Sequence, residues 1–99
     1  LEKTTKSNLG LAVITDDKKK LIGVISDGDI KRIMKEYKNF QSIRIKTVMT
    51  KTPIIVSPTM LAAEALSILE DNNINALPVI DKNKVVGILT LKDVIKSIN

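Results

Sequence analysis

Ninety-nine residues provide for one small domain or for two half-size repeats that share a core. Hydrophobic residues make up 43% of the chain, and cysteine and histidine are absent, which excludes disulfides, zinc sites and catalysis by a nucleophile paired with histidine. The net charge is +5, but with only one tyrosine and one phenylalanine to stack on bases we expect no nucleic-acid partner. Lacking a membrane-length apolar run or a signal peptide, the sequence predicts a soluble cytoplasmic protein that binds no membrane.

The first part of the chain predicts a helix end, a hairpin and a second helix. Residues 1–10 resemble the tail of a helix that closes at Gly10. Residues 11–15 and 21–25 are aliphatic runs on either side of a short polar turn, which is typical of a β-hairpin. Ser26 then stands where an N-cap belongs, with Asp29 three residues on. Apolar residues follow at helical spacing, at Ile30, Ile33 and Met34.

The middle of the chain predicts a short strand and a helix. Residues 49–53 interrupt the pattern, and residues 54–56 form a brief apolar run that ends at Ser57-Pro58. Serine as N-cap and proline at the first helical position predict that a helix begins here. Its apolar stripe continues through Asn72.

The last part of the chain repeats the pattern of the first. Residues 77–80 and 85–89 predict a second hairpin, and Thr90 and Asp93 occupy the capping positions of a final helix. Apolar residues at Val94, Ile95 and Ile98 continue this helix.

An internal repeat connects these two parts. Residues 20–26 and Asp29 correspond in order to residues 84–90 and Asp93. Leu11, Val13 and Ile14 correspond to Leu77, Val79 and Ile80 at an offset two residues larger, so the first hairpin loop is two residues longer. We expect residues 1–46 to form the first repeat, truncated at its N-terminus, and residues 47–99 to form the second. The first repeat has few residues before its hairpin, so we expect that the chain begins inside a helix and was cut from a longer protein.

The pattern Gly-hydrophobic-hydrophobic-Ser/Thr-x-x-Asp occurs at residues 23–29 and again at residues 87–93. With the run at residues 77–81 and the linker at residues 48–50, it resembles a tandem pair of CBS domains, also called a Bateman module. The resemblance implies an α+β fold in which each repeat is βαββα, with a small antiparallel-rich sheet and two helices. It also implies a pseudo-twofold axis between the repeats and a regulatory role without catalysis.

The run at residues 9–13 followed by residues 26–32 is similar to the C-terminal CBS pair of arabinose 5-phosphate isomerases. This resemblance implies an upstream sugar isomerase domain in the parent protein and carbohydrate metabolism in the Kdo pathway. We also expect a homodimer, because so short a chain leaves apolar helix faces to cover and the first repeat lacks its opening strand, which leaves a sheet edge open. Its regulatory ligand would be an adenine nucleotide or the cytidine-activated sugar CMP-Kdo, with no cofactor required. A CBS pair of a sugar-phosphate nucleotidyltransferase is an alternative, as is a structural dimerisation module with degenerate pockets.

Two interpretations apply to the Ser/Thr-x-x-Asp motifs at residues 26–29 and 90–93, called the first and the second corner below. Each corner caps a helix without any ligand. The same corner also offers free amides to a phosphate and a carboxylate to a ribose, as the CBS resemblance implies. The candidate ligand-binding residues are Ser26, Gly28, Asp29, Ile54, Val56, Leu77, Pro78, Thr90, Lys92 and Asp93. We expect no catalytic residue and no metal ligand among them.

Charge distinguishes the two corners. Asp27 brings a negative charge to the first, whereas Lys92 brings a positive charge to the second. On charge alone the corner of Thr90 and Asp93 is the better anion site, so loss of Asp93 is expected to harm binding more than loss of Asp29. Residues 27–29 lack the spaced acidic ligands of a calcium loop.

Overall fold

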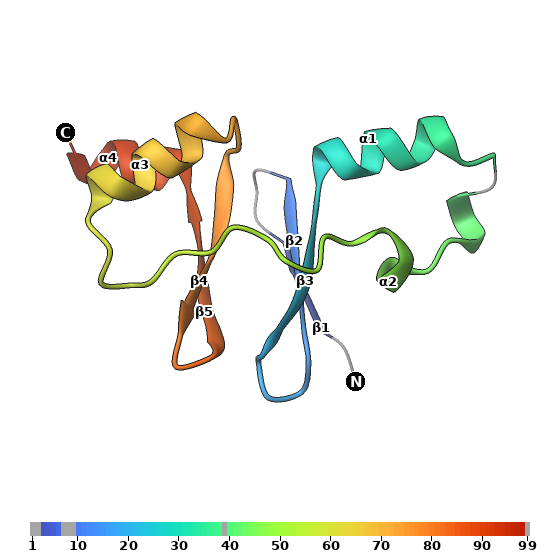
Figure 1. Ribbon diagram of the computed structural model, residues 1–99, viewed down its shortest axis with the longest axis horizontal. Helices are drawn as coiled ribbons and strands as arrows, with labels where there is room; N and C mark the ends of the chain where they lie inside the picture. The colour runs from blue at the N-terminus through green and yellow to red at the C-terminus, as the bar shows by residue number, and fades with distance from the viewer. Residues whose placement is uncertain (1–2, 7–9, 39, 99) are drawn as a thin grey trace.

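The computed structural model describes residues 3–6, 10–38 and 40–98 of the chain. Two antiparallel sheets lie next to each other, and three of the helices lie at one end of the molecule, with the hairpin turns at the other (Figure 1). A linker crosses the front of the sheets to connect the two halves (Figure 1). The predicted α+β class is confirmed.

The first half holds three strands and one long helix. Strands β1 (Lys3–Lys6), β2 (Leu11–Thr15) and β3 (Leu21–Ser26) pair in that order, and helix α1 (Asp27–Glu36) follows directly. The predicted hairpin is confirmed. A 3₁₀ turn and a short helix, η1 and α2, then lead into the linker, at Phe40–Ser42 and Ile45–Val48 respectively.

The predicted helix tail at residues 1–10 is wrong for the residues that the structure describes there. Strand β1 pairs antiparallel with β2, so that Lys3 lies opposite Thr15. Thr4 and Thr5 are β-branched and favour a strand over a helix. The outer edge of β2, expected to stay open, is therefore covered, while residues 1–2 and 7–9 lie outside the described part.

The second half holds helix α3 (Ala62–Asp71), strands β4 (Ala76–Asp81) and β5 (Lys84–Thr90), and helix α4 (Leu91–Ile98). The hairpin and the last helix are confirmed. The expected strand at residues 54–56 is reduced to a single parallel bridge between Val56 and Val79.

Helix α3 begins four residues later than the Ser-Pro pair predicts. Ser57 Oγ accepts a hydrogen bond from the amide of Thr59 at 3.2 Å, and the amide of Met60 donates to the Ser57 carbonyl at 3.1 Å. These bonds close a separate turn, and Leu61 becomes the N-cap. Local capping chemistry at Ser57 therefore forms a turn and not the first turn of a helix.

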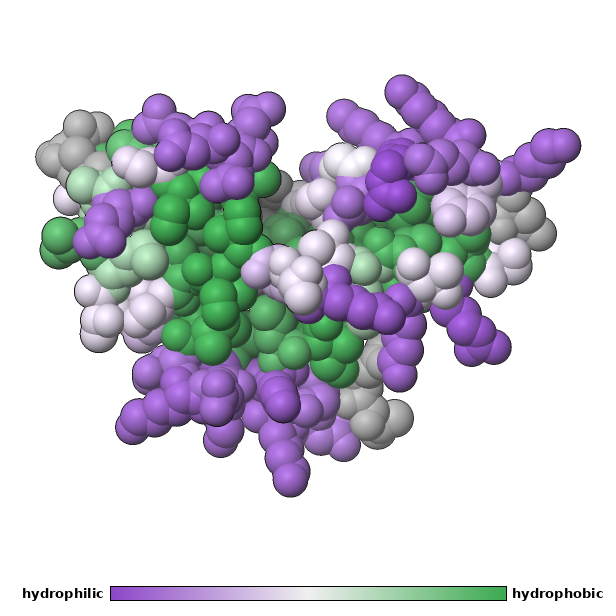
Figure 2. Space-filling model, in the orientation of Figure 1, coloured by the Kyte–Doolittle hydropathy of each residue, from purple (hydrophilic) through white to green (hydrophobic). Residues whose placement is uncertain are grey.

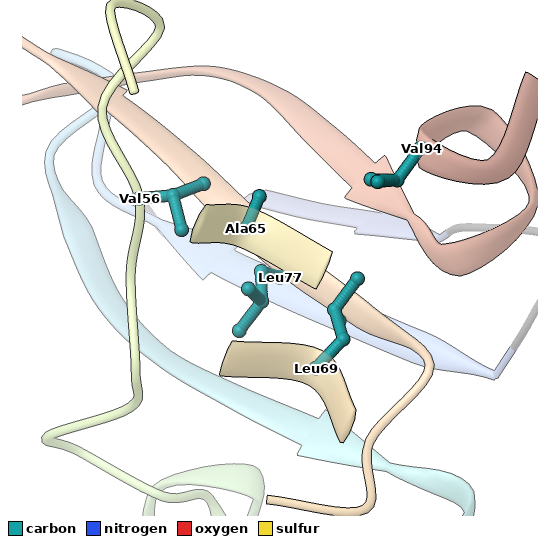
Figure 3. Packing of buried hydrophobic residues seen from close by; sticks show 5 residues of the cluster. All are labelled: Val56, Ala65, Leu69, Leu77 and Val94. Carbon is teal, nitrogen blue, oxygen red and sulfur yellow. The ribbon is translucent and has the colours of Figure 1, made fainter. Parts of the chain in front are cut away.

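The core has a cluster in each half and one that joins them. The second-half cluster comprises Val56, Ala65, Leu69, Leu77 and Val94, contributed by the linker, α3, β4 and α4 (Figure 3). A cluster of Leu11, Val13, Val24 and Ala76, with Leu21, Val85 and Ile88 packed against it, holds the two sheets together. The third cluster, in the first half, contains Ile14, Ile25 and Met49.

The first hairpin turn is organised by one carboxylate. Asp16 Oδ1 accepts the amides of Lys20 at 2.9 Å and Lys18 at 2.8 Å. The bond from Lys20, then that from Lys18 and the positive charges of both, hold the pKa of Asp16 below its ordinary value of 3.8. These interactions of ionised Asp16 thus stabilise the folded chain above pH 3.8. The stabilisation is lost as the pH falls through the lower pKa that Asp16 has in the folded state.

We expect Asp16→Asn to lower the melting temperature at pH 7, because the neutral amide gives up the charge-dependent part of these bonds. The difference from the parent should shrink as the pH falls through the folded-state pKa of Asp16. Circular dichroism melts between pH 2 and pH 7 measure it. A difference that does not change over this range would contradict the role of Asp16.

Candidate functional site

The first corner is a complete capping box. Ser26 Oγ accepts the amide of Asp29 at 3.2 Å, and Asp29 Oδ2 accepts the amide of Ser26 at 2.9 Å. Arg32 lies 3.5 Å from the other carboxylate oxygen of Asp29. The side chain of Asp29 is thus held in place, and within the described part of the chain its Oδ1 atom contacts only Arg32, at 3.5 Å.

A cavity of about 430 Å³ opens beside this corner, between the two halves. This volume lies within the range of small-molecule sites. Four chain segments line it: Gly10 and Leu11; Val24, Ser26, Asp27 and Gly28; Thr50, Thr52, Pro53 and Ile54; and Asn73, Ile74, Asn75, Ala76, Leu77 and Pro78. The cavity therefore depends on both repeats and on the linker between them.

Half of the predicted site residues come together here. Ser26 and Gly28 lie at its helical end, whereas Ile54, Leu77 and Pro78 contribute apolar wall. Asp29 is next to the cavity through its bonds to Ser26 but does not line it. Val56 was predicted at the wall and instead lies in the core, with 4% of its surface exposed.

The other predicted residues lie at the second corner. Thr90 Oγ1 accepts the amide of Asp93 at 3.2 Å, so the cap predicted there is formed. Lys92 and Asp93 are exposed and, like Thr90, do not line the cavity described above. The two halves of the predicted site are thus separate.

The predicted site contained five of the sixteen lining residues and missed, among others, Gly10, Asn73 and Asn75. Gly10 has φ of +79°, and a Cβ atom added there would collide with the carboxyl group of Asp27. Asn73 and Asn75 come from the loop between α3 and β4, where the Asn75 carbonyl accepts the amide of Leu91 at 2.8 Å. The Asn-Asn-Ile-Asn sequence before a predicted strand was the available signal, because asparagine favours turns with a left-handed backbone conformation.

The charge of the cavity comes from one residue. Asp27 is the only ionisable side chain among the described residues that line it. No group of three acidic, histidine or cysteine side chains that could hold a metal occurs in the described part of the chain. The site therefore offers apolar wall, amide and hydroxyl groups and one carboxylate, which suits a small organic molecule.

Two sheet-and-helix repeats with a shared core and a cavity between them define a paired α+β module. The CBS domain family matches residues 1–36 and 45–99, and the chain belongs to this family. The predicted resemblance is confirmed.

Relatives of this sequence are longer proteins. The chain is 38% identical over 98 residues to arabinose 5-phosphate isomerase KdsD of Pseudomonas aeruginosa, covering 98% of the chain and 30% of the relative. It is 34% identical to KdsD of Yersinia pestis, covering 94% of the chain and 28% of the relative. The chain thus spans less than a third of the curated relatives that it matches. No helix in the described residues is long and apolar enough to cross a membrane.

Solved structures of CBS pairs share the fold. The CBS domain pair of MJ0100, in complex with 5′-methylthioadenosine and S-adenosyl-L-methionine, is 26% identical with a TM-score of 0.76, covering 92% of this chain and 71% of that one. CBSX2 in complex with AMP is 26% identical with a TM-score of 0.77, covering 90% and 70%. Both of these relatives bind adenosine compounds.

Proposed function

We propose that the chain is a regulatory module that senses an adenine nucleoside or nucleotide in the cavity beside Ser26. The observation that carries the proposal is the cavity itself, which has ligand size and is lined by residues of both repeats and of the linker. A ligand bound there contacts the linker and both sheets at once. Its binding would therefore stabilise one arrangement of the two repeats, as regulation requires.

The lining residues suggest how the ligand lies. Ile54 provides the exposed apolar surface for a base, while Leu77 and Pro78 line the cavity from almost completely buried positions. Ser26 and Gly28 lie at the N-terminus of α1, where the amides of Asp27 and Asp29 already donate to Gly10 and Ser26. Among the described residues of this turn, the amide of Gly28 is therefore the one that would donate to a sugar or phosphate oxygen. The Oδ1 atom of Asp29 lies at the same corner, 3.5 Å from Arg32, and would accept a hydrogen bond from a ribose hydroxyl.

Calorimetry with the 99-residue chain tests the proposal. AMP, 5′-methylthioadenosine, S-adenosyl-L-methionine and CMP-Kdo are titrated separately, and we expect saturable 1:1 binding of at least one adenosine compound. Binding of CMP-Kdo alone would replace adenine with the cytidine-activated sugar as ligand. No binding of any of them at millimolar concentration would overturn the sensing function and favour the structural module.

We expect Asp27→Asn to raise the affinity for AMP about fivefold and to leave that for uncharged 5′-methylthioadenosine nearly unchanged. A unit charge about 4 Å from a phosphate costs roughly 1 kcal/mol in water-like surroundings, and Asp27 is exposed. Titration of both ligands against parent and variant measures the change. An equal gain for both ligands would show that Asp27 acts through shape and not through charge.

We infer that the parent protein carries an upstream sugar isomerase domain and that this module regulates it. The similarity to KdsD over nearly the whole chain supports this proposal. The isolated 99 residues should not interconvert arabinose 5-phosphate, because the residues that transfer the proton would belong to the isomerase domain. Turnover above a protein-free control would contradict the assignment of catalysis to another domain.

We propose second that the chain forms a homodimer. The alternative function, a structural dimerisation module, depends on the same proposal. Ile30, Met34 and Tyr37 form an exposed apolar stripe on α1, with Met34 57% exposed. Val94, the counterpart of Ile30 in the second repeat, is buried against α3. Light scattering at tens of micromolar should give the dimer mass, and Met34→Lys should give the monomer. A monomeric parent chain would contradict this proposal.

A further inference from the structure

A second cavity, of about 460 Å³, lies between the turns of the two hairpins, at the end of the molecule away from α1, α3 and α4 (Figure 1). Both repeats line it, the first with Asp17, Lys18 and Lys19 and the second with Lys84, Val85 and Val86. None of these residues lines the cavity beside Ser26. The second cavity is therefore a separate feature that the proposed sensing function does not use.

A backbone hydrogen bond joins the two turns that form this cavity. The amide of Val85 donates to the Lys19 carbonyl at 2.8 Å, and Lys19 has a left-handed backbone conformation with φ of 66°. The Val85 side chain is half-buried and packs against the cluster that holds the two sheets together. The two turns are thus fixed relative to one another, and the charges that they carry are held close together.

Positive charge exceeds negative charge in the lining of this cavity. Lys18, Lys19 and Lys84 line it together with one carboxylate, that of Asp17. Within the described part of the chain, no carboxylate forms an ion pair with any of the three lysines. The neighbouring Asp16 does not line the cavity, and its Oδ1 atom accepts two backbone amides of its own turn. The protein therefore compensates the charges of the three lysines only in part.

The chemistry of this lining favours a phosphate group. Lysine binds phosphate as a point charge with three N–H donors, which imposes little directional requirement on the ligand. The lining lysines outnumber the lining aspartate by two, so an anion with at least two negative charges fits best. Hydrophilic residues gather at the hairpin ends, below the hydrophobic surface of the sheets (Figure 2). The volume lies within the range of small-molecule sites.

We propose that the cavity between the hairpin turns binds a small phosphate-bearing anion with two or more negative charges through Lys18, Lys19 and Lys84. Such an anion would contact both turns at once. It would therefore add to the Val85–Lys19 bond in holding the two repeats in one arrangement, and its binding would stabilise the folded chain. Free phosphates and phosphate esters share this chemistry.

The test titrates inorganic pyrophosphate and arabinose 5-phosphate separately into the isotopically labelled chain at low ionic strength. We expect the amide signals of Val85 and Val86 to shift saturably. Because the lysines are exposed, the dissociation constant should be on the order of 1 mM. The affinity should fall when sodium chloride is added, because salt screens exposed charges. The ligand that binds more tightly shows whether the site takes free phosphates or phosphate esters.

Charge variants locate the anion. Lys84→Gln should weaken binding about fivefold, the effect of removing a unit charge about 4 Å from the anion in water-like surroundings. Lys18→Gln should have a similar effect, and the two substitutions together should weaken binding about 25-fold. The matched control is Lys82→Gln, which makes the same change of charge in the turn of the second hairpin. Lys82 is exposed and does not line the cavity, so this variant should keep the parent's affinity.

Any of four results would overturn the proposal. No saturable shift of Val85 and Val86 at about 10 mM of either ligand would mean that the cavity binds no phosphate. Equal weakening by Lys84→Gln and Lys82→Gln would mean that the net charge of the chain, and not the cavity, attracts the anion.

A shift confined to Gly28 would place the anion in the cavity beside Ser26. Tighter binding of an oligoglutamate than of both phosphates would assign the lysines to an acidic polypeptide. The titrations contain no nucleotide, so their result is independent of the sensing function.

Discussion

Replacing Asp29 with alanine is expected to weaken adenosine-ligand binding thirty-fold to over a hundred-fold. The substitution removes an acceptor for ribose hydroxyls and the bond that holds the amide of Ser26 at 2.9 Å. Loss of a charged hydrogen-bonding partner costs about 2 to 3 kcal/mol, which corresponds to this change in affinity. Calorimetric titration of parent and variant with the same ligand measures it.

The matched control is Asp93→Ala at the second corner. Each substitution removes an acidic residue from the first turn of a helix, so both should cost about 0.5 to 1 kcal/mol of stability. The charge of Lys92 predicts a larger binding loss at Asp93, whereas the cavity beside Ser26 predicts a larger loss at Asp29. We expect Asp29→Ala to cause the larger loss of binding, because the cavity lies beside Ser26. A larger loss from Asp93→Ala would place the ligand at the second corner, and equal losses would mean that both corners are occupied.

Local patterns in the sequence predicted the elements whose causes are local. The hairpins follow from aliphatic runs on either side of polar turns, and the cap at Ser26 follows from the spacing to Asp29, because these contacts span only a few residues. The internal repeat then extended the prediction to the whole fold. The cap predicted at Ser57 failed, because its hydroxyl bonds to Thr59 inside a separate turn.

The cavity could be predicted only in part, because it depends on contacts between distant segments. Gly10 and Asn75 reach it from opposite halves of the chain, and neither carries a recognisable chemical motif. Val56 shows the opposite error, since an apolar residue next to a predicted wall proved to be core. Apolar character alone does not distinguish a residue that lines a cavity from one that fills the core.

A comparison of alanine variants at Leu69 and Leu77 separates effects on stability from effects on ligand binding. Each is 1% exposed, and both belong to the cluster shown in Figure 3, but only Leu77 also lines the cavity. Truncation of a buried leucine to alanine costs about 2 to 5 kcal/mol, so both variants should unfold at clearly lower denaturant concentration. Among the molecules that remain folded, Leu69→Ala should keep the parent's ligand affinity.

Leu77→Ala should in addition weaken ligand binding, because the void that it leaves lies directly behind the cavity wall and lets the wall shift. A loss of about 1.4 kcal/mol of this support corresponds to roughly a tenfold weaker affinity. Urea titrations give the stabilities, and calorimetry under conditions in which each variant is folded gives the affinities. Equal affinity losses in the two variants would mean that loosening the core, and not loss of the wall at Leu77, controls binding, and the base would then have to lie elsewhere.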